Sequence, residues 1–456
     1  MVWQLLNLVT AGATLLLALY AIRSLRDFRT TFVVLAVWAR YVLSALDEYT
    51  YPPLVAGFSI NSLSSIAVAC AGIALVPLHF YSQFLTRLLP LLLIFAVVMF
   101  SGLINTEFGG MIKDVMKWLY FLALTLLLYR AFLLFDRDIV LRGLLAASLT
   151  PLLLQVFSVV LGKGSVDYND TMTYIGGYGG QAGFSLTLFT ILCFSALIRW
   201  RYDVTVLAMV PICLLGIHLA NYRTTILAAL PLVAVILASF VVKWTPPVLR
   251  PLTLLYVLAG GVGAVVLGVQ FLPPRFFDIV VVLQSLGELI KPPEAYTAAE
   301  MDLFTGRIYL WAHYLSAWFD GSPAVHAFGF GPEAWDGVEP KYAHNTFISY
   351  LYEFGLVGLG CLMLFFATQL TIAARVTPPA LALRLMAAFA GFLIANLATM
   401  PLWLIEGLIL LATLCALSWA TVDAERAATP ARRRIGARWQ AASIPHRTGV
   451  ARGTRR

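Results

Sequence analysis

The stretch "RTTILAALPLVAVILASFVV" (residues 223–242) begins with an arginine and then continues to residue 242 without another charged side chain. A helix needs roughly 20 mostly apolar residues to cross a bilayer core about 30 Å thick, so this stretch predicts one membrane-spanning helix. The run is continuously apolar and does not alternate with polar residues, which favours a helix over a strand of a membrane barrel. Arg223 stands at the edge of the span, where a charge is costly unless it has a partner or a task.

Comparable apolar windows recur along almost the whole chain of 456 residues. Hydrophobic residues make up 61% of the composition and charged residues only 12%, and the mean hydropathy is +0.86. This composition cannot provide the polar surface of a soluble protein. We therefore expect an all-α polytopic membrane protein with about 12–13 transmembrane helices. The candidate spans are 2–22, 31–46 (short, and holding Arg40), 57–78, 88–104, 115–135, 139–161, 182–198, 204–219, 224–242, 252–272, 346–374, 381–400 and 403–420.

The cysteines and the net charge argue against a disulfide framework, a metal site and a nucleic-acid partner. All five cysteines fall inside apolar runs without CxxC spacing, so the sequence indicates neither a disulfide framework nor a metal site. Much of the net charge of +8 comes from the arginine-rich residues 421–456. After a membrane domain, such a segment favours a disordered cytoplasmic tail lying on anionic lipid over a nucleic-acid partner.

The basic connections between spans fall on alternate sides, as the positive-inside rule requires. On the side that we assign to the cytoplasm lie 23–29, 199–203, 243–250, the Arg375 connection and the tail. On the other side, which is the periplasm in a bacterium, lie 47–53, 105–110, 162–181 and a long segment at about 273–345. We divide the chain into N-terminal transmembrane helices (1–272), a periplasmic segment (273–345), C-terminal transmembrane helices (346–420) and a basic cytoplasmic tail (421–456).

The periplasmic segment is too long for a simple connection and is expected to be functional. Between residues 300 and 319, apolar side chains recur at helical spacing, which predicts an amphipathic helix lying along the membrane surface. The residues of the predicted apolar stripe are Phe304, Ile308, Trp311, Leu315 and Trp318.

Three side chains that could carry chemistry lie on the predicted periplasmic side: Arg223, Arg307 and His344. Taken singly, each arginine could snorkel to the headgroups and the histidine could be an interfacial residue. Taken together, they suit one task, because arginine forks bind phosphate bidentately and a histidine can accept a proton from a hydroxyl. The two arginines and the histidine would suit a reaction in which a lipid diphosphate is the leaving group and a sugar hydroxyl is the nucleophile.

The stretch "AHNTFISYLYEFGLVG" (343–358) resembles the signature of the bacterial O-antigen ligase and polymerase family, in which a histidine and a small polar residue precede two spaced glycines. His344, Asn345, Gly355 and Gly358 fill these places. "GRIYLW" (306–311) and "RTTIL" (223–227) resemble the family's two arginine motifs. By the order of its motifs, the resemblance covers roughly residues 180–375. The earlier spans resemble the family only in their hydropathy.

The resemblance implies a GT-C-like inner-membrane glycosyltransferase, inverting and metal-independent, with no cofactor and with its active site facing the periplasm. Its donor would be an undecaprenyl-diphosphate-linked glycan, and its acceptor lipid A-core or a growing glycan. Arg223 and Arg307 would hold the diphosphate, and His344 would activate or orient the acceptor hydroxyl. His218 and His313 remain rival bases.

Asn345 and Glu353 are possible supporting residues. Asn345 either caps the following helix or contacts substrate. Glu353 sits within an apolar helix, where its burial calls for a partner such as an arginine, so an ion pair and a catalytic role both stay open.

We favour ligation of O-antigen to lipid A-core, because the chain has one dominant periplasmic segment. Polymerisation of repeat units and transfer to protein hydroxyls remain alternatives. A polysaccharide or lipid transporter is the alternative of another class, and it would place polar residues near bilayer mid-depth. The distinctive polar residues gather instead at one surface, which favours an enzyme.

Overall fold

The computed structural model describes residues 2–55, 57–166, 171–201, 203–269, 291–301, 303–339 and 341–442. Within this part of the chain, long helices occur at all thirteen predicted spans, and nine of them are long and apolar enough to cross a membrane. These nine are α1 (Val2–Ile22), α2 (Phe28–Ala45), α6 (Leu85–Ile104), α7 (Phe108–Leu134), α8 (Arg137–Val160), α11 (Arg223–Trp244), α18 (Thr346–Ala374), α19 (Pro379–Asn396) and α20 (Ile405–Ala442). The other four are α4 (Ile60–Leu75), α9 (Gln181–Leu197), α10 (Asp203–Leu219) and α12 (Arg250–Val269).

The prediction of an all-α polytopic membrane protein is therefore confirmed. The only strands in the described residues form two short antiparallel hairpins, β1 (Pro53–Val55) with β2 (Phe58–Ser59) and β3 (Ser165–Val166) with β4 (Met172–Thr173). The last helix is longer than predicted, since α20 continues to Ala442. Residues 443–456 of the predicted tail lie outside the described residues.

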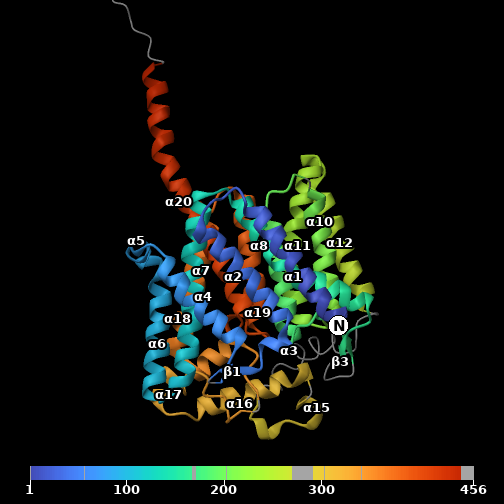
Figure 1. The fold of residues 1–456 in the computed structure, drawn as a ribbon, viewed down its shortest axis with the longest axis vertical. Helices are drawn as coiled ribbons and strands as arrows, with labels where there is room; N and C mark the ends of the chain where they lie inside the picture. The colour runs from blue at the N-terminus through green and yellow to red at the C-terminus, as the bar shows by residue number, and fades with distance from the viewer. Residues whose placement is uncertain are drawn as a thin grey trace, which may run out of the picture.

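The long helices run side by side, and short elements close one end of the bundle (Figure 1). These are α15 (Ala298–Met301), α16 (Arg307–Phe319) and α17 (Pro323–Phe328), which lie at the lower end in this view, while α20 leaves the bundle at the opposite end. The centre of the bundle is formed by α9, by the middle of α7 and by the part of α20 up to residue 428, where most apolar side chains are buried.

A buried ion pair explains how α2 tolerates Arg40 inside a span. Its Nε lies 3.0 Å from Oε1 of Glu406, at the start of α20, and the two side chains are only 8% and 2% exposed. The hydroxyl of Ser44 and the amide oxygen of Asn61 complete the hydrogen bonding around the pair. A charge within the bilayer needs such partners, so this pair joins α2 to α20 near the lower end.

Helix α18 is broken at Gly355, one of the two glycines of the sequence motif. Its φ of 63° and ψ of −164° are not helical. In a regular helix, the carbonyls of Tyr352 and Glu353 would accept from the N–H groups four residues later. Here they accept instead from the backbone N–H groups of Phe330 (2.9 Å) and Gly331 (3.0 Å). The break thus anchors the segment that leads from α17 towards His344.

The helix predicted over 300–319 is shorter than expected and turned on its axis. Phe304, Thr305 and Gly306 all have positive φ, so α16 begins only at Arg307. Its buried residues are Leu310, Tyr314 and Trp318, and of these only Trp318 belongs to the predicted stripe. This face packs against Ala343 and Tyr352, so α16 covers α18 and its preceding loop. Residues 273–290 of the predicted periplasmic segment lie outside the described residues.

We predict that Gly355→Ala destabilises the protein. A Cβ at this position would lie 2.4 Å from the backbone of Ala327, and the positive φ adds strain of roughly 1–3 kcal/mol. Thermal unfolding in detergent should show a clear fall in Tm. Gly360→Ala is the matched control, because a Cβ there meets open space in the same helix. Equal Tm values for the two variants would contradict the role assigned to the break.

Candidate functional site

The candidate site lies at the lower end of the bundle, where three helices begin. Arg223 is the first residue of α11, Arg307 is the first residue of α16, and His344 stands two residues before α18. The N-terminus of a helix carries partial positive charge and unpaired N–H groups, which favour an anionic ligand. All three residues selected from the sequence therefore stand at, or just before, the start of a helix at this end.

Arg307 reaches across to the start of α11. Its Nη1 lies 3.4 Å from Oγ1 of Thr224, its Nη2 lies 3.4 Å from the hydroxyl of Tyr222, and its guanidinium stands 5.9 Å from the centre of the Tyr222 ring. Tyr222 and Thr224 are the two neighbours of Arg223 in the chain. Arg307 follows Arg223 by 84 positions in the chain. Its guanidinium nevertheless lies at the start of α11, the helix that Arg223 begins.

The loop before α18 is held by the same helix that carries Arg307. The indole N–H of Trp311 donates to the carbonyl of Ala343 (2.8 Å), and the hydroxyl of Tyr314 donates to the carbonyl of Lys341 (2.8 Å). These two bonds fix the backbone on both sides of Tyr342, immediately before His344. Helix α16 therefore positions the cation and the histidine together.

His344 packs in an aromatic corner. Its ring centre lies 4.1 Å from that of Tyr342, and Tyr342 in turn stacks on Trp403 with the ring centres 5.8 Å apart. Trp403 belongs to the short 3-10 helix η5 (Pro401–Trp403) before α20 and also contacts Trp335. Sequence analysis missed this corner because Trp403 falls at the start of the apolar run that was interpreted as the last span.

The environment keeps the His344 imidazole neutral at neutral pH. Burial is the main cause that lowers its pKa, to about 4, and the positive charges of Arg307 and Lys341 act in the same direction. A neutral imidazole can accept a proton, as a general base requires.

Asn345 caps helix α18. Its side-chain oxygen accepts from the backbone N–H groups of Phe347 (3.0 Å) and Ile348 (3.3 Å), so the capping role predicted as one of two alternatives is observed. The adjacent Thr346 is also fixed, because its hydroxyl donates to the side chain of Asn396 in α19 (2.6 Å).

Within the described residues, the hydrogen bonds that the Glu353 carboxylate accepts come from neutral donors and not from an arginine, the example of a partner that its burial suggested. Glu353 is fully buried and accepts from the hydroxyl of Ser349 and from the backbone N–H of Glu333 (3.0 Å). Glu333 in turn forms ion pairs with Lys113 and Lys117 of α7. Glu353 therefore ties the loop before His344 to α18 and lies behind the site.

Strained backbone gathers around the site. Among the described residues, eight non-glycine residues have positive φ, a conformation that costs free energy outside glycine. Six of them stand in the segments that form or support the site: Asn221, Phe304, Thr305, Glu333, His344 and Met400. Such strain persists only where the surrounding contacts impose it, and it clusters at functional sites. A sequence pattern of helical periodicity cannot detect it.

The two rival histidines lie in different surroundings. His218 is exposed near the end of α10. His313 is half-buried and packs edge-on against Tyr309, with the ring centres 4.6 Å apart. In the part of the chain that the structure describes, no group of three or more histidine, cysteine or acidic residues is arranged to hold a metal ion.

A scan against protein-family models matches residues 207–363 to the O-antigen ligase family. This part of the chain is thus similar to the O-antigen ligase family. The matched region extends from α10 into α18 and contains Arg223, Arg307, His344, Asn345 and Glu353. A search among curated proteins finds no match.

The match to the O-antigen ligase family supports a ligase- or polymerase-type function with glycan and lipid substrates. The matched region includes the elements that supply the residues described above, namely α11, α16 and the start of α18. The earlier helices α1–α9 lie outside the matched region and supply part of the packing around it.

We predict that Arg307→Gln raises the pKa of His344. One of the two positive charges that disfavour protonation is removed, while burial remains, so the pKa should rise and stay below about 6.5. The pH dependence of His344 modification by diethyl pyrocarbonate, followed by mass spectrometry, measures this. Arg375→Gln, an exposed residue at the other end of α18, is the control. A wild-type pKa at or above about 6.5 would contradict the electrostatic description.

Proposed function

We propose that the protein is a bacterial inner-membrane glycosyltransferase that transfers glycan from undecaprenyl diphosphate to an acceptor hydroxyl at the periplasmic face. The observation that carries the proposal is the arrangement around α16. This helix brings Arg307 to the start of α11 and holds the loop of His344 through Trp311 and Tyr314. Two cations at helix N-termini and a neutral imidazole then face the same end of the bundle.

Arg223 and Arg307 would bind the diphosphate of the donor. Guanidinium groups remain charged at every physiological pH and match phosphate oxygens with paired N–H donors. Both cations stand at helix starts, where the helix dipole adds favourable interaction with an anion. The leaving group of the reaction is itself this diphosphate, so the same contacts would stabilise the charge that develops on it in the transition state.

His344 would act as the general base. Its neutral ring would accept the proton of the acceptor hydroxyl as that oxygen attacks the anomeric carbon. The bond from this carbon to the diphosphate oxygen breaks in the same displacement, which inverts the configuration and releases undecaprenyl diphosphate. A bound diphosphate offsets the positive charge of Arg307, and thereby raises the pKa of His344 from its low value towards the range of an effective base.

The orientation follows from the distribution of basic residues. The connections with lysine and arginine lie at the end of the bundle opposite to the candidate site, and the positive-inside tendency assigns them to the cytoplasm. The site then faces the periplasm. Its charged residues lie at one end of the helices and not at mid-depth, which supports an enzyme over a transporter.

For the acceptor, we favour lipid A-core, and therefore ligation of O-antigen in lipopolysaccharide biosynthesis. One long segment between α12 and α18 supplies Arg307, Tyr342 and His344. Growth of a polymer by repeat units uses the same donor chemistry with a different acceptor hydroxyl, so polymerisation remains the second candidate.

We predict that His344→Ala lowers the rate of transfer by at least about a hundredfold, the scale of a lost general base. The assay uses purified protein in liposomes with an undecaprenyl-diphosphate-linked glycan and isolated lipid A-core, and follows glycan transfer by gel mobility. His218→Ala tests a rival base in the same assay, and it should retain activity if His344 is the base. Transfer by His344→Ala within a few fold of wild type would remove the histidine from this role.

Deletion of the gene should leave lipopolysaccharide that ends at the core. This outcome follows from ligation, because no repeat unit could then be attached. A product of core plus one repeat unit would instead identify a polymerase. Unchanged lipopolysaccharide, with loss of another polymer or of a glycoprotein, would contradict both assignments. Analysis of the extracted lipopolysaccharide by gel electrophoresis distinguishes these results.

A further inference from the structure

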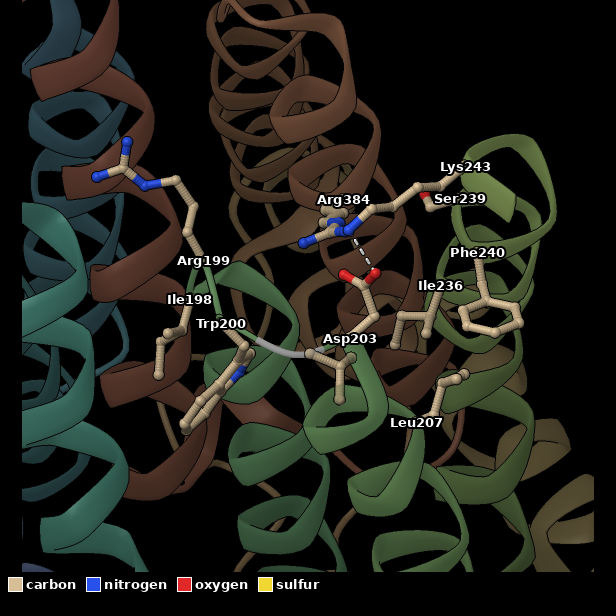
Figure 2. Close-up of a pocket in the computed structure, with 11 residues that line it drawn as sticks. Ile198, Arg199, Trp200, Asp203, Leu207, Ile236, Ser239, Phe240, Lys243 and Arg384 are labelled. Carbon is tan, nitrogen blue, oxygen red and sulfur yellow. Dashed lines mark hydrogen bonds and ion pairs between the residues drawn. The ribbon is translucent and has the colours of Figure 1, made fainter. Parts of the chain in front are cut away.

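A second group of charged side chains surrounds a pocket at the other end of the bundle. Helix α11 connects the two places, because its 22 residues extend over about 33 Å from Arg223 to Trp244. The pocket has a volume of about 280 Å³ and lies between the end of α9, the start of α10, the end of α11 and α19 (Figure 2). It is separate from the candidate site described above.

Two of the three cations at this pocket already have acidic partners. Arg199 pairs with Asp138 and Asp136 at the start of α8, and it points away from the other charged residues in Figure 2. Lys243 pairs with Asp203 across the pocket. These pairs leave Arg384 of α19 as the cation to be explained.

Arg384 forms no ion pair with an acidic side chain within the described residues, although Asp203, the partner of Lys243, attracts it electrostatically. Its Nη1 donates to the carbonyl of Ala196 (2.8 Å), and its buried Nε has no hydrogen-bond partner among them. A buried guanidinium N–H without an acceptor is costly. Of the charged side chains that line the pocket, Arg384 and Lys243 are cationic and share one carboxylate, Asp203, while Arg199 has its own acidic partners. The pocket therefore offers a net positive charge to a ligand.

The remaining lining suits the boundary between headgroups and hydrocarbon. Val206, Leu207 and Ile236 provide an apolar side, and Trp200 and Phe240 stand at its rim. Trp244 nearby is 65% exposed. Exposed tryptophan beside lysine and arginine marks the membrane interface.

We propose that this pocket binds the phosphate of an anionic glycerophospholipid from the adjoining leaflet. Basic pockets between transmembrane helices on the positively charged side are suited to anionic lipid headgroups. The guanidinium of Arg384 donates to the phosphate oxygens, and Lys243 is a second cation in the lining of the pocket, beside Asp203. The volume is near the lower end for small-molecule sites, roughly 300 Å³, which fits a headgroup whose acyl chains leave along Leu207 and Phe240.

The test compares lipids and variants of the full chain, purified in detergent and stripped of lipid. Phosphatidylglycerol should raise the Tm of the wild type by several degrees, whereas phosphatidylcholine and inorganic phosphate should not. Arg384→Gln should lose at least half of this shift. Arg375→Gln removes one charge from the same end outside the pocket and should keep it. Counting of bound phosphatidylglycerol by native mass spectrometry should give the same ranking.

Three results would overturn the proposal. An undiminished response of Arg384→Gln would exclude the guanidinium, and equal losses in both variants would indicate a general effect of surface charge. A full shift with inorganic phosphate would identify a free-anion site and not a lipid site. If Arg384→Gln does not fold, Ser239→Trp fills the pocket from α11 and keeps the charge. Its response to phosphatidylglycerol should also be lost, and a retained response would contradict the proposal.

Discussion

The break in α18 at Gly355 is the constraint on which the candidate site depends. A continuous helix would use the carbonyls of Tyr352 and Glu353 for its own hydrogen bonds. Because the helix is interrupted, these carbonyls bind the backbone of Phe330 and Gly331, and the Glu353 carboxylate holds Glu333. The chain leading to His344 is thereby attached to a transmembrane helix. A glycine in the motif is explained by this close crossing, since a side chain would meet the backbone of the opposite segment.

Helix α16 has two roles in the candidate site. Through its first residue, α16 contacts the start of α11, and through Trp311 and Tyr314 it holds the loop before His344. The strained residues preceding α11, α16, α18 and η5 lie at these junctions. The packing of the bundle offsets the free energy that this strain costs. The strained end therefore depends on the stability of the transmembrane core. The same arrangement keeps His344 neutral, because burial and the positive charge of Arg307 both lower its pKa.

The sequence predicts the membrane helices well because apolarity over about 20 residues is set by the bilayer itself. The bounds of α1 and α18 agree with the predicted spans to the residue. Periodicity failed over 300–319, since the left-handed turn at 304–306 interrupts a pattern that looks helical and rotates the buried face to Leu310 and Tyr314. Motifs located Arg307 and His344, whereas the partners of Glu353 and the stacking of Trp403 on Tyr342 depend on contacts between distant segments.

The central claim is that the arginines at the starts of α11 and α16 and the histidine before α18 form one diphosphate site. The most direct measurement is an electron cryo-microscopy structure of the full chain with undecaprenyl diphosphate bound. We expect the diphosphate oxygens at about 3 Å from the guanidinium groups of Arg223 and Arg307, with the imidazole of His344 on the side from which an acceptor would enter. Diphosphate density elsewhere, out of reach of both guanidinium groups, would contradict the account.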